Sequence, residues 1–234
     1  MFSIIIPTLN EESIIEKAIN QFSSIKNKYN IEIIVSDSGS SDQTVSIARN
    51  ISDKVVVYEK DNCNISKARN LGAEHAKNKI LVFLDADILI KDTDYFFKII
   101  LDYINKDNFS AISPRISIYP DQEKIQDKCI HFVITLISNI LNGLGLSYSR
   151  GGCQIIHKKN FDRISGYNEA FVAAEDVDIF RRLRKLGKTM IVNNLHVYES
   201  PRRYRKKGYL IVLYFWLMNW IYTLFFNKSF STKW

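Results

Sequence analysis

Apolar runs alternate with amphipathic stretches over the first 90 residues, and this alternation constrains the fold more than any other feature of the sequence. The runs SIIIP, IEIIVSD, KVVVYE and KILVFLD are rich in β-branched residues, and stretches with helical periodicity, such as NEESIIEKAINQFSSIK, separate them. Short β-rich runs separated by helical segments of ten or more residues predict βαβ units and a parallel sheet. We therefore expect an α/β fold.

Polar residues stand at the ends of three of these runs. They are Asn10 and Glu11 after the first run, Asp37 and Ser38 at the end of the second, and Asp85 and Asp87 at the end of the fourth. In doubly wound sheets of the Rossmann type, ligands bind outside the carboxyl ends of the strands. We expect residues 1–90 to form a nucleotide-binding half with one site at this edge.

Asp85 and Asp87 stand one residue apart at the end of ILVFLDADIL, the most apolar run. Two carboxylates this close repel each other, and burial raises the cost unless a cation or hydrogen-bond donors compensate. Carboxylate oxygens suit Mg²⁺ or Mn²⁺, and Mg²⁺ commonly shares its coordination between one or two carboxylates and substrate phosphates. An Asp-x-Asp pair also occurs by chance, so the pair alone leaves a structural role open.

The following residues predict a second half of the same domain. We expect a helix over residues 92–105, strands at FSAISPRISIY and GGCQIIHKK, a helix at EDVDIFRRLRKLG that ends at Gly187, and two closing strands at KTMIVNN and LHVYES. Since no repeat or low-complexity linker interrupts the pattern, residues 1–200 are interpreted as one domain, with residues 91–200 as its second half. The segment CIHFVITLISNILNGLGL is a mostly apolar helix with one polar stripe, either in the core or against lipid.

The net charge of +7 is concentrated in residues 201–234, because the remainder holds 25 basic and 25 acidic residues. RRYRKKG leads into the uncharged run YLIVLYFWLMNWIYTLFF, and this combination favours a membrane surface over nucleic acid. Eighteen helical residues span roughly 27 Å, near the hydrocarbon thickness of a bilayer. A membrane span or re-entrant anchor, an in-plane helix and a contact in a homodimer remain open.

Composition and the start of the chain bear on its setting. A hydrophobic content of 46% over 234 residues supplies an ample core. The three cysteines lack the spacing of a disulfide framework or a zinc site. MFSIIIPTLN lacks the basic and apolar regions of a signal peptide. We expect a location on the cytoplasmic side of the cell membrane.

Five segments occur in the order SIIIPTLNEE, VSDSGSSDQT, ISKARNLGA, VFLDADI and AAEDVDIFRRLRKLG. Together they resemble the family 2 glycosyltransferases of the GT-A fold, and the resemblance covers residues 2–207. It implies a Rossmann-like mixed sheet flanked by helices, here with a basic and apolar tail that associates with membranes. It also implies a metal-dependent enzyme that uses a nucleoside-diphosphate sugar linked to UDP, GDP or dTDP.

The resemblance assigns roles to particular residues. The nucleotide-binding residues would be Pro7, Thr8, Leu9, Glu11, Asp37, Lys67, Arg69, Asp85 and Ala86. Asp87 would bind Mg²⁺ or Mn²⁺ directly with Asp85 nearby, and His196 is either a further metal ligand or a structural histidine. Gly151, Gly152, Arg202 and Arg203 would border the sugar and the acceptor.

Glu175 and Asp176 are the implied catalytic pair. Asp176 would act as the general base on an acceptor hydroxyl, and Glu175 would position either the acceptor or Asp176 itself. Both residues also favour a helix N-terminus through the dipole. Attack opposite the leaving diphosphate inverts the anomeric centre. If the acceptor were a polyprenyl-type lipid phosphate, already ionised, no base would be needed.

Other classes of protein fit less well. Haloacid-dehalogenase phosphatases place an Asp-x-Asp pair after their first strand, and sugar nucleotidyltransferases need a Gly-rich, Arg-containing loop that PTLNEE does not supply. A non-catalytic module that binds nucleotide sugars would not need both acid pairs. We expect the acceptor to be a lipid-linked glycan or another membrane-associated molecule.

Overall fold

The structure is a computed structural model that describes residues 1–58, 63–106 and 109–231. Its strands are β1 (Phe2–Thr8), β2 (Ile31–Asp37), β3 (Lys54–Val57), β4 (Ile80–Leu84), β5 (Ile88–Leu89), β6 (Phe109–Ile118), β7 (Cys153–His157) and β8 (Lys188–Glu199). Its helices are α1 (Ile15–Asn20), α2 (Lys26–Tyr29), α3 (Thr44–Ile51), α4 (Ile65–Glu74), α5 (Thr93–Lys106), α6 (Ile125–Gly143), α7 (Lys158–Arg163), α8 (Glu175–Arg184), α9 (Arg202–Lys207) and α10 (Tyr209–Phe226).

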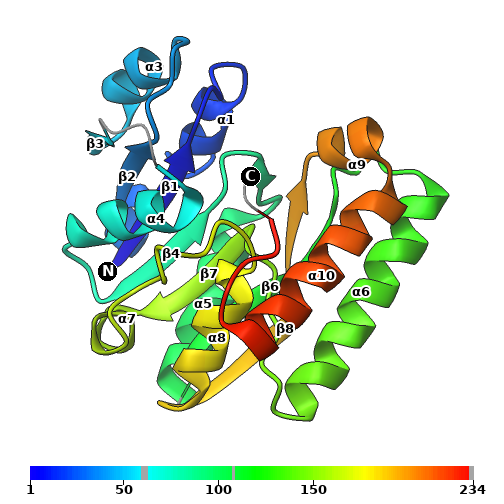
Figure 1. The fold of residues 1–234 in the computed structure, drawn as a ribbon. Helices are drawn as coiled ribbons and strands as arrows, with labels where there is room; N and C mark the ends of the chain where they lie inside the picture. The colour runs from blue at the N-terminus through cyan, green and yellow to red at the C-terminus, as the bar shows by residue number, and fades with distance from the viewer. Residues whose placement is uncertain (59–62, 107–108, 232–234) are drawn as a thin grey trace.

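The described strands form one mixed sheet in the order β3-β2-β1-β4-β7-β6-β8-β5 (Figure 1). The predicted parallel pairing is confirmed, because β1 pairs in parallel with β2 and β4, and β2 with β3. β7 is antiparallel to β4 and β6 and joins the two halves, while β6 and β8 pair in parallel. The carboxyl ends of β1, β2 and β4 therefore lie at one edge, as the sequence predicts.

Two sequence predictions about elements were wrong. The segment after β1, expected to be one helical stretch, forms the separate helices α1 and α2. The two closing strands are one strand, β8, with an irregularity in the middle, since Val192 lies opposite Pro114 and His196 lies opposite Arg115. Proline lacks an N–H for the ladder, so a break in register beside Pro114 leaves no backbone donor missing.

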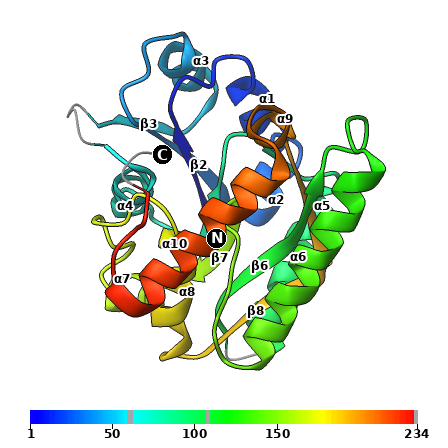
Figure 2. The same ribbon diagram turned by 45° about the vertical axis from the view of Figure 1, so that its right-hand side comes forward.

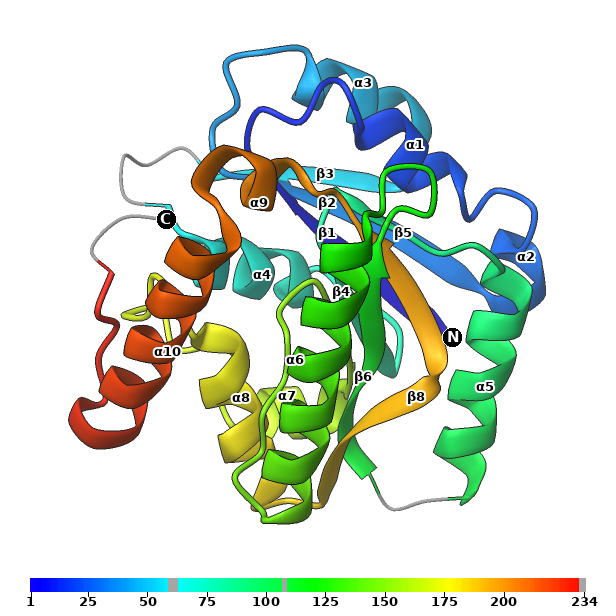
Figure 3. The ribbon, with the colours of Figure 1, turned by 90° about the vertical axis from the view of Figure 1, so that its right-hand side faces the viewer.

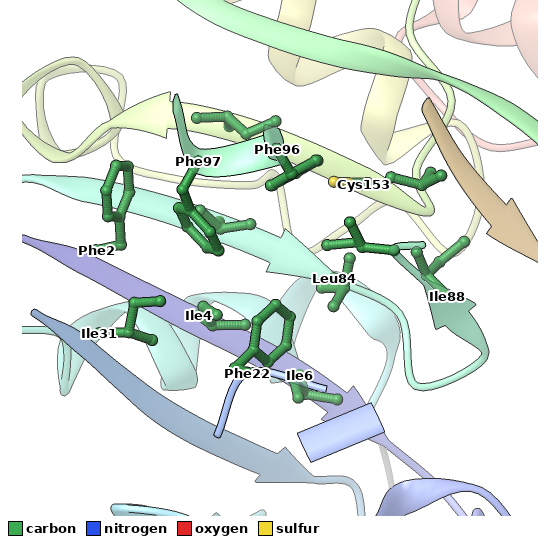
Figure 4. Close-up of a cluster of buried hydrophobic side chains, with 14 of the residues drawn as sticks. Phe2, Ile4, Ile6, Phe22, Ile31, Leu84, Ile88, Phe96, Phe97 and Cys153 are labelled. Carbon is green, nitrogen blue, oxygen red and sulfur yellow. The ribbon is translucent and has the colours of Figure 1, made fainter. Parts of the chain in front are cut away.

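Helices cover both faces of the sheet. On one face α1, α3 and α5 pack against β1 and β4, and Phe22 and Phe97 enter the same buried cluster as the strand residues (Figure 4). On the other face α4, α7 and α8 enclose Phe83, Phe161 and Phe180. Figure 3 shows α5 on one side of β6 and β8, with α6, α8 and α10 on the other.

The tail is folded onto this second face (Figures 1 and 2). Val212 of α10 and Tyr204 of α9 form a small buried cluster with Ile118. Asn219 and Thr223 of α10 are also buried. Among the described residues, α10 is the one helix long and apolar enough to cross a bilayer, and 17% of that segment is buried within the protein.

Candidate active site

The end of β4 is held against the glycine turn that precedes β7. The N–H of Asp85 donates to the carbonyl of Gly152 at 3.0 Å, and the N–H of Ile88 donates to the carbonyl of Asp85 at 3.0 Å. A Cβ atom on Gly152 would lie 3.0 Å from the Ile88 side chain, and one on Gly151 would lie 3.3 Å from a carboxylate oxygen of Asp176. The absence of side chains on these glycines lets the two acid pairs approach one turn.

Arg69 of α4 links the two acid pairs. Its guanidinium donates to Asp85 Oδ1 and to Glu175 Oε1, each at 2.8 Å, and to the carbonyl of Gly151 at 3.0 Å. The side chain is 1% exposed, and its guanidinium carbon lies 5.3 Å from the centre of the Tyr167 ring. A buried guanidinium needs this degree of pairing to offset its lost hydration. The structure thus shows Arg69 bound to protein oxygens, and the expected contact with the nucleotide stays a prediction.

Both acid pairs line one cavity of about 300 Å³. Its wall includes the predicted site residues Arg69, Asp85, Asp87, Gly151, Gly152, Glu175, Asp176 and Arg203. The remaining lining comes from Tyr148, Arg150, Ala173, Ala174, Val177, Glu199, Ser200, Tyr204, Lys207, Val212, Phe215, Trp216, Asn219, Trp220 and Ser231. The structure therefore brings together the predicted catalytic and metal residues at the end of β4 and the start of α8.

Asp87 carries an unfavourable charge in this setting. Burial raises the pKa of Asp87 to about 7, and the charge of Asp85 adds to the rise, whereas Arg202 opposes it. Arg202 Nε lies 3.4 Å from Asp87 Oδ2. A divalent cation between the carboxylates would remove the same cost, because it favours their charged forms.

The carboxylate oxygens of Asp85 and Asp87 fit Mg²⁺ or Mn²⁺ when substrate phosphates and waters complete the coordination. Within residues 1–58, 63–106 and 109–231, no group of three or more His, Cys, Asp or Glu side chains is placed to hold a metal. Asp85 and Asp87 supply hard oxygen ligands, and one or two carboxylates with substrate phosphates and waters make up a common Mg²⁺ site. The pair therefore suits a cation that arrives with a diphosphate.

Glu175 and Asp176 begin α8, directly after Ala174, whose φ of 61° is left-handed. Burial raises the pKa of Glu175 to about 7, and the charge of Asp176 adds to the rise while Arg69 opposes it. Burial also raises the pKa of Asp176, again against Arg69. A carboxylate with a raised pKa is a stronger base, which suits proton transfer from a hydroxyl near neutral pH.

Several of the expected nucleotide-binding residues lie at the ends of β1 and β2, where Asp37 holds the loop after β2 in place. The buried carboxylate of Asp37 accepts hydrogen bonds from Thr8 Oγ1 at 2.9 Å and from the N–H groups of Gly39 and Ser40 at 2.9 and 2.7 Å. Pro7 pairs with Ser36 in the sheet, and Leu9 is 55% exposed. These contacts fix the shape of the edge where a nucleotide is expected, and the direct contacts stay predictions.

The remaining predicted residues lie at other places. Glu11 pairs with Arg202, which also reaches Asp87 and so connects the end of β1 to the end of β4. Lys67 Nζ lies 5.9 Å from the centre of the Tyr58 ring. His196 lies on β8 outside the cavity lining, with Nε2 2.8 Å from Ser117 Oγ. The geometry therefore favours the structural histidine of the two alternatives.

A second buried ion network borders the cavity and was not found from the sequence. Arg150 pairs with Glu199, donates to the Tyr204 hydroxyl at 3.1 Å, and lies 5.4 Å from the centre of the Trp216 ring. His131 Nδ1 lies 3.3 Å from the same guanidinium. Arg150 precedes the glycine turn in SRGG, and this adjacency was the one available signal.

The sequence of residues 3–174 matches the model of the family described as glycosyl transferase family 2, and this segment is well over half of the chain. A 4,4'-diaponeurosporenoate glycosyltransferase of Staphylococcus haemolyticus is 28% identical over 180 residues. That alignment covers 72% of this chain and 47% of the relative. The chain thus spans about half the length of this curated relative.

Solved structures share the fold. A mannosyltransferase of Pyrobaculum calidifontis, in complex with GDP-Man and Mn²⁺, has a TM-score of 0.76 at 17% identity, over 95% of this chain and 63% of that one. Glucosyl-3-phosphoglycerate synthase of Mycobacterium tuberculosis, with Mn²⁺, UDP and phosphoglyceric acid, has a TM-score of 0.65 at 22% identity, over 96% and 77%. The expected mixed sheet of the GT-A type is confirmed.

Proposed function

The chain belongs to glycosyl transferase family 2, and from that premise we propose that it transfers a sugar from a nucleoside-diphosphate sugar to a membrane-associated acceptor, with inversion of the anomeric centre. The observation that carries the proposal is that Arg69 joins Asp85 and Glu175 at the wall of one cavity. This arrangement supports the proposal, because the pair proposed to bind the cation and the proposed base line one cavity.

The roles of the residues follow from this geometry. Asp87, with Asp85, would hold Mg²⁺ or Mn²⁺, which when bound supplies positive charge to the leaving diphosphate. Asp176 accepts the proton of the acceptor hydroxyl as the oxygen forms its bond to the anomeric carbon. The bond between the anomeric carbon and the diphosphate breaks, and the diphosphate leaves with the electron pair. Arg69 and Glu175 hold Asp176 and the Gly151 turn in place.

The proposed donor site lies at the ends of β1, β2 and β4. The loops that Asp37 anchors lie at the strand ends where ligands bind in such sheets. The structural relatives with GDP-Man and with UDP support a donor of the same class. We propose a UDP-, GDP- or dTDP-linked sugar as the donor.

A binding screen tests this function. The purified protein with Mn²⁺ is offered a panel of UDP-, GDP- and dTDP-sugars, and we expect one nucleotide class to bind and its sugar to be hydrolysed slowly. Asp87→Asn should abolish the Mn²⁺-dependent part of donor binding and hydrolysis. Asp102→Asn, the same change at an exposed position of α5, should have no effect on either. If no donor binds or is hydrolysed, the proposal is wrong.

Membrane association is proposed from the surface of α6 and α10. These helices expose apolar side chains, including Phe132, Val133, Leu136, Ile137 and Ile140 on α6 and Leu210, Ile211, Tyr214 and Leu217 on α10. The basic helix α9 directly precedes α10, and each basic residue near an anionic surface contributes about 1 kcal/mol. We propose that this surface lies on the cytoplasmic leaflet.

The fold supports an in-plane helix over a span. Asn219 Oδ1 accepts hydrogen bonds from the N–H groups of Phe230 and Ser231, each at 3.0 Å, so the segment after α10 returns onto it. Flotation with phosphatidylcholine vesicles, with and without phosphatidylglycerol, tests the proposal. We expect binding that increases with phosphatidylglycerol and is lost in a Leu210→Asp, Leu217→Asp variant. A stable dimer without vesicle binding would instead indicate contact between two copies.

A further inference from the structure

One side of α10 faces the catalytic cavity. Val212, Phe215, Trp216, Asn219 and Trp220 recur at the spacing of one helical face, and all of them line the cavity that holds the two acid pairs. The indole Nε1 of Trp220 is buried and makes no hydrogen bond to the described residues. The tail helix is therefore a wall of the cavity and supplies three of its five aromatic lining residues.

Cationic side chains border the same part of the cavity. Arg203 and Lys207 of α9 line it beside the aromatic residues of α10. Two further arginines line the cavity: Arg69 pairs with Asp85 and Glu175, and Arg150 pairs with Glu199. The α9–α10 side thus combines positive charge with an apolar wall, whereas the two acid pairs come from the end of β4 and the start of α8.

We propose that the α9–α10 side of the cavity, defined as Arg203, Lys207, Phe215, Trp216 and Trp220, binds the phosphate group of a lipid-linked glycan acceptor, whose attacking hydroxyl belongs to the glycan. The proposal rests on the proposed function, because it places the acceptor in the same cavity as the donor. Arg203 and Lys207 contact the phosphate, as cations do in charge-assisted hydrogen bonds. The aromatic residues contact the first carbons of the apolar chain, which are removed from water there.

The opposite face of α10 is an apolar surface on which the chain of such a lipid can lie. Leu210, Ile211 and Leu217 are more than half exposed and do not line the cavity. One helix therefore separates the cavity from the apolar outer surface, and both sides of it are compatible with hydrocarbon. A lipid whose phosphate lies in the cavity keeps the remainder of its chain at this surface.

The positions of the tryptophans allow ligand binding in the cavity to be measured by fluorescence. The chain has three tryptophans, Trp216, Trp220 and Trp234. In a Trp234→Phe protein, the remaining emission comes only from the wall of the cavity. We expect geranyl phosphate to shift this emission to shorter wavelength with saturation, geraniol to bind at least tenfold more weakly, and inorganic phosphate alone to cause no shift.

Matched variants distinguish binding in the cavity from binding at the outer surface. Lys207→Ala should lower the affinity for geranyl phosphate about tenfold. Lys206→Ala, one position away and outside the cavity lining, should leave this affinity unchanged. Phe215→Ala should lower the affinities for both geranyl phosphate and geraniol, whereas Leu217→Ala on the outer face should change neither affinity. Equal effects of Lys206→Ala and Lys207→Ala, or equal affinities for geranyl phosphate and geraniol, would overturn the inference.

Calorimetry with the nucleotide panel and Mn²⁺ on the same protein distinguishes the two possible failures. If the donor binds and geranyl phosphate does not, the lipid-phosphate site is wrong and the proposed function stands. If geranyl phosphate binds and no donor does, the proposed function fails while the site remains.

Discussion

The guanidinium of Arg69 lies 2.8 Å from the carboxylate of Glu175, a residue 106 positions away in the sequence. The same guanidinium contacts Asp85. This one side chain therefore sets the relative positions of the residues expected to bind the cation and those expected to accept the proton.

Arg69→Ala should destabilise the protein and inactivate it. The change leaves Glu175 buried without its cation, and breaking a buried ion pair by removal of one partner costs about 3–5 kcal/mol. Thermal unfolding measures the loss, and Arg49→Ala, at an exposed position of α3, serves as the control. Near-equal unfolding temperatures for the two variants would contradict the role of Arg69. In an Arg69→Ala, Glu175→Gln protein, part of the stability should return.

Asp176→Asn should reduce sugar transfer by about 10²–10⁴-fold, the usual contribution of a general base. Donor binding should remain close to that of the unchanged protein, because the amide has almost the same shape. Steady-state transfer rates and donor affinities are compared with those of Asp102→Asn. Full activity of Asp176→Asn would show that the attacking oxygen is already ionised, as in a lipid phosphate, and that Asp176 is not a base.

Acid should release the tail from the domain. Although burial acts in the opposite direction, hydrogen bonds from Arg205 and Tyr209 hold the pKa of Asp127 well below its ordinary value of 3.8. A lowered pKa in the folded state means that the ionised carboxylate stabilises the fold at neutral pH and that this contribution is lost as the pH falls below about 4.

The emission of the tail tryptophans measures this release. Asp127→Asn should lower the free energy of unfolding by about 2 kcal/mol at pH 7, a typical value for hydrogen bonds to a charged group. It should also flatten the change in emission below pH 4. Asp121→Asn, at an exposed position in the same region, should leave both quantities unchanged. An acid transition that persists in Asp127→Asn would assign it to other carboxylates.

Ser229→Ala should impair catalysis through the loop before α8. Ser229 Oγ accepts hydrogen bonds from the N–H groups of Val172 and Ala173 at 3.0 and 3.2 Å and donates to the carbonyl of Ala173 at 2.8 Å. Loss of these bonds costs about 1–3 kcal/mol at buried groups. We expect a lower transfer rate with unchanged donor affinity, and Ser24→Ala as an inert control. Equal losses of transfer and donor binding would indicate general destabilisation instead.

The sheet was largely predictable from the sequence, because its strands carry local signals. The runs that became β1, β2 and β4 are apolar on both faces, as expected for strands that helices cover on each side. The continuity of β8 was not predictable, since Asn193 and Asn194 resemble a turn and only the pairing with β6 on both sides of Pro114 shows one strand.

The residues of the candidate site could be named from the sequence, but their arrangement in space could be predicted only in part. The motifs identify Asp85, Asp87, Glu175 and Asp176, and the cavity brings them together. They do not reveal that Arg69 joins them, because its partners are distant in the sequence. They also do not identify α10 as a wall, since a helix that is apolar on all sides shows no periodicity to mark the face that turns inward.

The contact between Ser229 and the loop at Ala173 has a consequence for engineered versions of the protein. The two residues are 56 positions apart, and their hydrogen bonds join the segment after α10 to the loop that precedes Glu175 and Asp176. A fusion or truncation that displaces the segment around Ser229 would therefore remove hydrogen bonds from this loop, although no strand of the sheet would be altered.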